Sequence, residues 1–408
     1  MIKPLFTRSR PIDEWAYAAI ICLFGGLVLS RSLYSVGLLL MALYCFLNAQ
    51  STGLWCRPWF WSMLAIPAIV LWADGLQGTV PDGVFYIKLS LPLFPLFFFA
   101  WRPGYQQVKI LIFWILAILG LTALYSIYTY IKAPVEAVDG YKQARVMQVG
   151  FYHDHIRISL AMAVSVLLAA YVGITSNTKR CRYICMAYAL LMVVFLHVLS
   201  ARTGLVALYV GVFTAMVWHL WKDHKGAMII ALASLILLPI LAYQYLPSFR
   251  HRMGFVRYDF GYYSKMEYRE GSSDGFRYYS LLSGCDHFVQ QPLTGVGFRG
   301  LHVANRAWFK AHFPQIREDE IIQPSSEFVL HAAAAGLPGF LIFVAFAVLP
   351  LSMQRLRKNG WFMAIYASIA ITWLFEILPE NQFGIFITGF FLALAWWLAE
   401  RNEKNPVN

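Results

Sequence analysis

The chain has 408 residues, of which 59% are hydrophobic and only 13% are charged, and its mean hydropathy is +0.58. A soluble chain of this length would carry roughly twice that share of charged residues, so the composition excludes a soluble globular protein and indicates a polytopic membrane protein. The formal net charge of +12 does not point to nucleic acid, because the basic cytoplasmic connectors of a membrane protein account for about half of these lysines and arginines.

The sequence predicts an all-α membrane protein with about twelve transmembrane helices, each roughly 17–25 residues long. The predicted spans are residues 14–31, 33–49, 59–75, 84–101, 107–131, 157–175, 182–200, 203–221, 227–245, 326–354, 361–379 and 382–399. We therefore expect three regions: helices 1–9 in residues 1–245, an extracytoplasmic and partly helical loop domain in residues 246–324, and helices 10–12 with a cytoplasmic tail in residues 325–408.

The charges of the connectors predict the orientation of the chain in the membrane. Basic residues gather at the N-terminus, in every second connector and in the C-terminal tail. Because positively charged connectors stay in the cytoplasm, both termini are expected there. The long polar stretch then lies outside the cytoplasm, together with the short connectors 132–156, 200–203 and 378–381. Its many arginines do not contradict this orientation, since long loops are translocated regardless of charge.

The first outer connector of interest, residues 132–156, carries cationic and hydrogen-bonding side chains just before a predicted span. Arg145 and His153 precede that span and Arg157 opens it. Helix N-termini favour phosphate and other anions, so these residues are candidates for an anion site. His153 and His155, on either side of Asp154, are of the residue type that binds metal ions. They can chelate one ion together only where the chain is extended, and no third ligand is apparent nearby in the sequence. We expect no metal here.

The next outer connector is the tight turn Ser200-Ala201-Arg202-Thr203-Gly204, which joins two predicted spans. An arginine at the depth of the lipid headgroups costs free energy unless it is paired or faces a polar cavity. Two interpretations of Arg202 stay open. Its side chain extends to the membrane interface, or its planar guanidinium makes a bidentate contact with phosphate.

The long outer stretch from Leu246 to Gln323 is rich in arginine, which suits either a basic surface against anionic lipid headgroups or an anion site. Within it, an amphipathic helix is expected from Asp274, with Arg277 in its first turn. This helix lies on the membrane surface, or it turns Arg277 into a cavity below. A turn-rich run, Gln-Pro-Leu-Thr-Gly-Val-Gly-Phe, follows at residues 291–298.

The segment after the loop combines a helix start, two ionisable residues and a helix break. Pro-Ser-Ser-Glu at residues 324–327 is typical of a helix N-terminus. Glu327 and His331 are four residues apart and so share a helix face. Gly-Leu-Pro-Gly at residues 336–339 breaks the helix at membrane depth, which is tolerated only against protein or a water-filled cavity. His331 is either a core histidine, or a general base or phosphate contact. Lys88, Glu376 and Glu380 lie near outer span ends and are possible partners.

The chain resembles the O-antigen ligase and polymerase superfamily over residues 140 to 340, roughly. The resemblance rests on the order of Ser-Ala-Arg-Thr-Gly after a span, Arg277 followed by Pro-Leu-Thr-Gly-Val-Gly-Phe, and Gly-x-x-Gly after the large loop. The ligase signature is histidine, then Asn, Ser or Gln, nine residues, glycine, two residues, and Gly, Thr or Tyr. Ser326, Gly336 and Gly339 fit it, whereas Ser325 stands at the histidine position.

The resemblance implies a GT-C-type glycosyltransferase in the bacterial inner membrane, with the large loop in the periplasm. The implied donor is polysaccharide on undecaprenyl diphosphate, and the acceptor is the sugar of lipid A-core, with membrane lipids around the protein. The reaction inverts the anomeric carbon and needs no metal or other cofactor. Arg202 and Arg277 are the implied diphosphate contacts, and Arg145, Arg157 and His153 are added to them from the anion-friendly connector.

The identity of the general base stays open. In the family the signature histidine is the proposed base, but Ser325 stands at that position here, and a serine does not act as a base unaided. We predict His331 and Glu327 as the catalytic residues; His153 and His312 are the other candidates. Three alternative functions also stay open: an O-antigen polymerase, a protein O-oligosaccharyltransferase, and a transporter for lipid-linked sugars. Broken helices and an arginine-lined cavity suit a transporter as well, but the single long outer loop and the lack of repeat halves speak against one.

Overall fold

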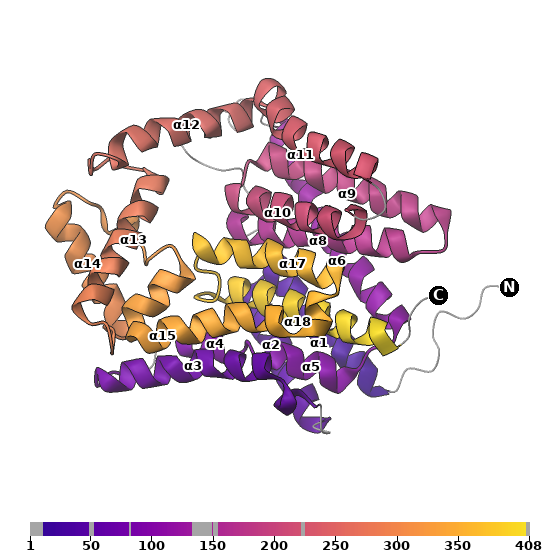
Figure 1. Ribbon diagram of the computed structural model, residues 1–408, viewed down its shortest axis with the longest axis horizontal. Helices are drawn as coiled ribbons and strands as arrows, with labels where there is room; N and C mark the ends of the chain where they lie inside the picture. The colour runs from indigo at the N-terminus through magenta and orange to yellow at the C-terminus, as the bar shows by residue number, and fades with distance from the viewer. Residues whose placement is uncertain are drawn as a thin grey trace.

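The structure, a computed structural model, describes residues 11–48, 53–80, 83–132, 149, 154–221 and 225–404. In these residues it contains helices and no strands, which confirms the prediction of an all-α protein (Figure 1). The elements up to residue 220 are α1 (Pro11–Val28), α2 (Arg31–Leu47), η1 (Leu54–Cys56), α3 (Pro58–Leu76), α4 (Gly83–Leu89), α5 (Leu93–Trp101), α6 (Tyr105–Lys132), α8 (His155–Thr175), α9 (Lys179–Leu199) and α10 (Arg202–Leu220). The later elements are α11 (Lys225–Tyr245), α12 (Pro247–Tyr263), α13 (Ser273–Gln290), α14 (Phe298–His312), η2 (Glu318–Glu320), α15 (Glu327–Ser352), α16 (Gln354–Arg357), α17 (Gly360–Ala370), η3 (Ile371–Leu374) and α18 (Gln382–Lys404).

Nine helical segments in the described part of the chain are long and apolar enough to cross a membrane. They coincide with nine of the predicted spans. The other three predicted spans correspond to the shorter apolar helices Glu14–Val28, Arg31–Leu47 and Gly360–Leu374. The protein is therefore a multi-pass membrane protein by length and composition of its helices, while the count of twelve spans stays a prediction.

The helices of the bundle differ in how much of their surface other helices cover. α18 and α8 are enclosed, with 89% and 83% of their most apolar segments buried, whereas α11 has only 6% buried. Small residues allow the close contacts: a Cβ at Gly204 of α10 would lie 2.5 Å from Cβ of Ser159 on α8. This contact fixes the start of α10, including Arg202, against the start of α8.

The loop predicted between residues 246 and 324 is largely helical and forms an arm at one end of the bundle. α13 and α14 lie at the left in Figure 1, near the end of α15, and α12 runs along the top of the view from α11 toward them. The arm has a small hydrophobic core of its own, formed by Phe276, Tyr279, Trp308, Phe309, Phe313 and Ile316. Because α13 also packs against α15, the arm is anchored to the bundle.

The break predicted in α15 is present, and the turn-rich run before α14 closes it. Ala335 and Gly336 leave the helical conformation, with φ of −130° and +62°. The backbone N–H groups of Val296 and Gly297 donate to the carbonyls of Ala333 and Ala334, at 3.0 and 2.8 Å. Leu337 N–H in turn donates to the carbonyl of Pro292 at 2.7 Å. The polar backbone groups that the break exposes are thus paired with protein, as membrane depth requires.

We expect Gly336→Ala to destabilise the protein. Gly336 has φ of +62° and ψ of −156°, a conformation that is nearly exclusive to glycine and costs other residues about 1–3 kcal/mol. An added Cβ would also lie 2.6 Å from the carbonyl carbon of Leu293. The midpoint of thermal unfolding in detergent should fall by several degrees. Gly300→Ala, which has open space at its Cβ, is the matched control. Equal midpoints for the two variants would contradict this account of the break.

Candidate active site

The two arginines that the sequence analysis marked most strongly lie in one polar cluster. Arg277 Nη2 donates to Glu376 Oε1 at 2.6 Å, and the hydroxyl of Thr203 donates to the same oxygen at 2.8 Å. Arg202, next to Thr203, forms an ion pair with Asp274. The start of α10, the first turn of α13 and the segment after η3 therefore meet at Glu376, although they are distant in sequence.

Local sequence signals place each of these side chains. Ser200 adopts a left-handed conformation (φ of 52°) that ends α9, so that α10 begins at Arg202 after a very short turn. The hydroxyl of Ser272 accepts from the N–H of Gly275 at 3.1 Å and caps α13. That cap puts Asp274 and Arg277 on neighbouring turns at the start of the helix, as the predicted amphipathic helix required.

A cavity of about 370 Å³ adjoins this cluster, and we call it the α13 cavity. Its lining residues are Gly271, Ser273, Phe276, Arg277, Asp319, Glu320, Ile322, Gln323, Ser325, Glu376 and Ile377. Ser325, which stands at the histidine position of the ligase signature, is thus in its wall. The hydroxyl of Ser280 donates to that of Ser325 and accepts from the N–H of Ser325, both at 3.1 Å.

Of the three carboxylates that line the α13 cavity, only Glu376 has an oxygen available for chemistry. Glu320 uses both oxygens, on the hydroxyl of Tyr268 and the N–H of Gly271, each at 2.7 Å. Burial and this contact with Glu320 raise the pKa of Tyr268 to about 12. Asp319 is exposed and paired with Arg317, which lowers its pKa. Among the described residues, no hydrogen bond reaches Oε2 of Glu376, and its side chain is only 7% exposed.

The predicted catalytic pair Glu327 and His331 does share a helix face, but both side chains are fully buried and neither lines the α13 cavity. His331 Nδ1 lies 2.8 Å from the backbone carbonyl of Glu327 and 3.5 Å from its carboxylate. The rings of Phe298 and Phe343 enclose the imidazole, with ring centroids 5.4 and 4.7 Å away. The structure thus surrounds this pair with protein.

A second charged pair lies close to them. Lys88 is fully buried and forms an ion pair with Glu380. Its Nζ also lies 4.1 Å from the centre of the Phe298 ring that contacts His331. Of the three candidate partners named from sequence, Lys88 and Glu380 therefore pair with each other, and Glu376 pairs with Arg277.

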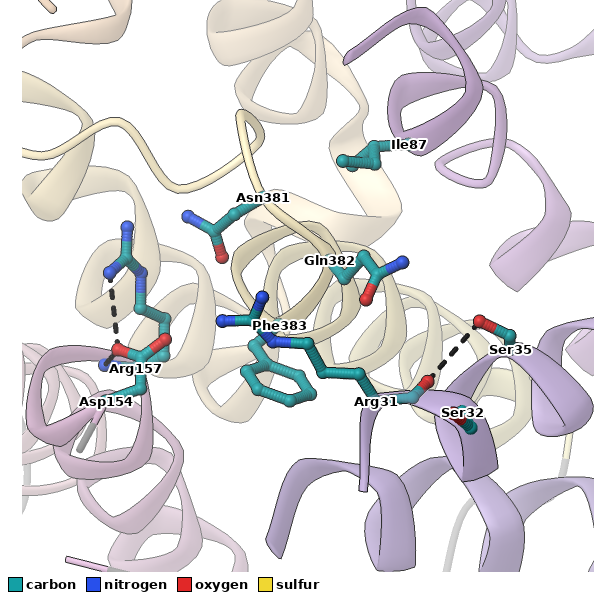
Figure 2. A pocket seen from close by; sticks show the side chains of 9 residues that line it. All are labelled: Arg31, Ser32, Ser35, Ile87, Asp154, Arg157, Asn381, Gln382 and Phe383. Carbon is teal, nitrogen blue, oxygen red and sulfur yellow. Dashed lines mark hydrogen bonds and ion pairs between the residues drawn. The ribbon is translucent and has the colours of Figure 1, made fainter. Parts of the chain in front are cut away.

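Arg157 lies in a different and larger cavity of about 510 Å³, shown in Figure 2, which we call the Arg31–Arg157 cavity. Its lining residues are Arg31, Ser32, Ser35, Ile87, Asp154, Arg157, Asn381, Gln382 and Phe383. The carboxylate of Asp154 caps α8 by accepting from the N–H of Arg157 at 3.3 Å and also pairs with the Arg157 guanidinium at 3.2 Å. Arg145 and His153, the other predicted diphosphate contacts, lie outside the described residues.

The residues described by the structure contain no group of three His, Cys, Asp or Glu side chains placed to hold a metal ion. His312, named as a possible base, lies on α14 with its ring stacked on Trp308, 4.0 Å between centroids. Neither cavity includes it in its wall.

Fold and site together define an all-α, multi-pass membrane protein in which two arginine–carboxylate ion pairs lie beside a cavity at the foot of a helical arm. Residues 187–344 match the family model of the O-antigen ligases. The match confirms that the chain carries a domain of the O-antigen ligase superfamily, whose members are glycosyltransferase-like enzymes acting on lipid-linked polysaccharides. None of the curated proteins gives a match.

The matched region holds Arg202, Arg277 and Ser325, but Glu376 and the Arg31–Arg157 cavity lie outside it. From sequence, Glu376 was only one of three possible charge partners near span ends, and Arg31 was not a candidate. The available signal was weak: Glu376 and Glu380 are two acidic residues in a short stretch between apolar segments. Such residues are functional candidates by default, because an ionisable group near membrane depth is costly.

Proposed function

We propose that the protein transfers polysaccharide from undecaprenyl diphosphate to lipid A-core, on the periplasmic side of a bacterial inner membrane. The observation that carries the proposal is that Arg202 and Arg277 lie in one polar cluster beside the α13 cavity. The buried carboxylate of Glu376 accepts from Arg277 and Thr203, and Arg202 pairs with Asp274. The positive-inside pattern of the connectors supports the orientation, with both termini in the cytoplasm.

The arginines are suited to a diphosphate leaving group. A guanidinium has five N–H donors in a planar fork that matches phosphate oxygens. The contact with Glu376 uses one donor of Arg277, so others are available to the donor substrate. As the bond to the anomeric carbon breaks, negative charge grows on the departing diphosphate, and fixed cations stabilise it more in the transition state than in the ground state.

Glu376 is the group best placed to act as general base. The acceptor hydroxyl attacks the anomeric carbon from the face opposite the diphosphate, which inverts that carbon. The electron pair of the breaking bond leaves with the diphosphate, and the hydroxyl proton passes to Oε2 of Glu376. Glu327 and His331, the pair predicted from sequence, would first have to be uncovered, because both are fully enclosed. In this scheme no metal or other cofactor takes part.

The test is a transfer assay with purified protein, undecaprenyl-diphosphate-linked polysaccharide and lipid A-core, run with a chelator present. A ladder of products on lipid A-core supports a metal-independent ligase. Longer chains on the donor lipid instead would make the protein a polymerase. Donor retained without any product would favour a transporter. Activity that the chelator removes and one divalent ion restores would overturn the metal-free mechanism.

A further inference from the structure

The Arg31–Arg157 cavity has the composition of an anion site that the proposed chemistry at Glu376 does not use. In Figure 2 the side chain of Arg31 extends from α2 toward the side where Arg157 lies on α8. In the same view the amide side chains of Asn381, just before α18, and Gln382, its first residue, lie above the Arg31 side chain. Among the described residues that line the cavity, Asp154 is the one carboxylate and two are arginines, so the formal charges of these described residues sum to a net positive value.

The helices around this cavity add to its positive potential. Arg31 is the first residue of α2 and Gln382 the first of α18, and Asp154 caps α8. Three helix N-termini therefore meet at one cavity, and each carries about half a positive charge from its backbone dipoles. Asp154 caps α8 by accepting from the N–H of Arg157, and Asn381 caps α18 by accepting from the N–H of Gly384 at 2.9 Å. Only Asp154 brings a negative charge, and anions bind where helix N-termini and cationic side chains coincide in this way.

The guanidinium of Arg157 is incompletely paired in the described part of the structure. Nη1 contacts Asp154 at 3.2 Å, but Nε is buried and has no hydrogen-bond partner among the described residues. A buried donor without an acceptor is destabilising. Arg157 lines the cavity together with Arg31, so a ligand oxygen there would give its guanidinium a further acceptor.

The size of the cavity and the uncharged residues among its lining indicate that the ligand is more than a phosphate ion. At about 510 Å³ the cavity lies in the range of pockets that hold small organic ligands. Hydroxyl and amide side chains (Ser32, Ser35, Asn381 and Gln382) suit the hydroxyl groups of sugars, and Phe383 and Ile87 provide apolar wall. This combination fits a sugar that carries a phosphate or diphosphate.

One short segment of the chain contributes residues to the walls of both this cavity and the α13 cavity. Ile377 lines the α13 cavity and Asn381 lines the Arg31–Arg157 cavity. Four residues of extended chain span no more than about 14 Å. The two cavities therefore lie close to each other along this segment.

We propose that the Arg31–Arg157 cavity binds the phosphorylated saccharide headgroup of a lipid substrate, as an anion site distinct from the α13 cavity. Its identification as a substrate site rests on the proposed function. The phosphate comes either from the diphosphate of the donor or from a phosphorylated sugar of the acceptor. Both sources present the same chemistry to the two arginines.

The first experiment needs no variant. Phenylglyoxal modifies accessible arginines of the full-length protein, and mass spectrometry of peptides then gives the rate at each arginine. Inorganic pyrophosphate, undecaprenyl diphosphate and lipid A are the three probes. We expect at least one of them to slow the labelling of Arg31 and Arg157 severalfold, while Arg180, an exposed arginine elsewhere, is labelled as before. Unchanged labelling of Arg31 and Arg157 with all three probes would overturn the proposal.

Three variants test the chemistry of the cavity by equilibrium binding of the protecting probe. Arg31→Gln and Arg157→Gln should each weaken binding about tenfold, because a hydrogen bond to a charged group is lost. Asp154→Asn should strengthen binding severalfold, since it removes the competing carboxylate while asparagine can still cap α8. Arg180→Gln is the control. Equal affinity in all four variants would contradict an anion site here, and a merely structural role does not predict tighter binding for Asp154→Asn.

The probes separate the possible sources of phosphate and keep this inference separate from the proposed function. Protection by pyrophosphate as well as a lipid shows that the phosphate group itself is recognised. Protection by undecaprenyl diphosphate alone assigns the cavity to the donor, and protection by lipid A alone assigns it to the acceptor. Protection in a protein that transfers no saccharide would sustain the site and refute the function. Saccharide transfer by a protein in which no probe protects Arg31 and Arg157 would sustain the proposed function and refute the site.

Discussion

Arg277→Ala is expected to lower the rate of saccharide transfer by about 10²–10³-fold, the loss typical of removing one group that stabilises charge in the transition state. Arg277 is the arginine that lines the α13 cavity, and its guanidinium is held by Glu376 at 2.6 Å. Removing it takes a cation from the departing diphosphate and leaves the buried carboxylate of Glu376 without its ion-pair partner. Arg202→Ala should act in the same direction, with a smaller loss, because Arg202 is not part of the cavity wall.

The measurement is the initial rate of transfer, normalised to the amount of folded protein in the membrane. Arg277→Lys should recover little activity, since a lysine lacks the planar fork that binds phosphate through two parallel hydrogen bonds. Arg306→Ala is a matched control in the same arm: it breaks an exposed ion pair with Glu318, and such pairs contribute little to stability. Wild-type rates for Arg277→Ala would refute its assignment to the diphosphate.

Glu376→Gln is the second variant for which we expect a large effect. Its kcat should fall about 10²–10⁴-fold, the usual contribution of a general base. The glutamine keeps the size of the side chain and an acceptor for Thr203 and Arg277, so donor binding should change little. Glu376→Asp should retain part of the activity. The dependence of kcat on pH gives a more specific readout: the decline on the acid side, where a carboxylate base becomes protonated, should disappear in Glu376→Gln.

The controls for Glu376 compare it with other carboxylates. Glu318→Gln changes an exposed residue of the same arm and should leave the rate unchanged. Glu327→Gln and His331→Asn test the pair predicted from sequence. If either of these abolishes transfer without loss of folded protein while Glu376→Gln stays active, the base belongs to the buried pair and not to the α13 cavity.

Sequence alone predicted much of the secondary structure of this protein. Crossing a bilayer requires every backbone N–H and C=O to be paired within a helix, so apolar segments of sufficient length already indicate where helices lie. The start of α13 near Asp274 and the break of α15 at Gly336 were equally readable, because capping residues and glycine act through local backbone geometry. The match to the O-antigen ligases confirms that the short motifs, although weak singly, were informative in their order.

The partners in each ion pair could not be predicted from the sequence, because they depend on which helices pack together. Arg277 and Glu376 are 99 residues apart, and Arg202 and Asp274 are 72 apart. Arg31 became part of a cavity only because the N-termini of α2, α8 and α18 meet. No local signal indicates such a meeting, since it results from packing along the entire length of each helix.

The sequence by itself determined the class of protein, the approximate helices and the break in α15, and it singled out Arg202 and Arg277 as candidates. Only the tertiary structure decided that Glu327 and His331, which share a helix face as predicted, are enclosed by Phe298 and Phe343, whereas Glu376 reaches a cavity. The physical reason is that helical periodicity fixes which side chains lie on one face, but the neighbouring helices decide whether that face meets protein or open space.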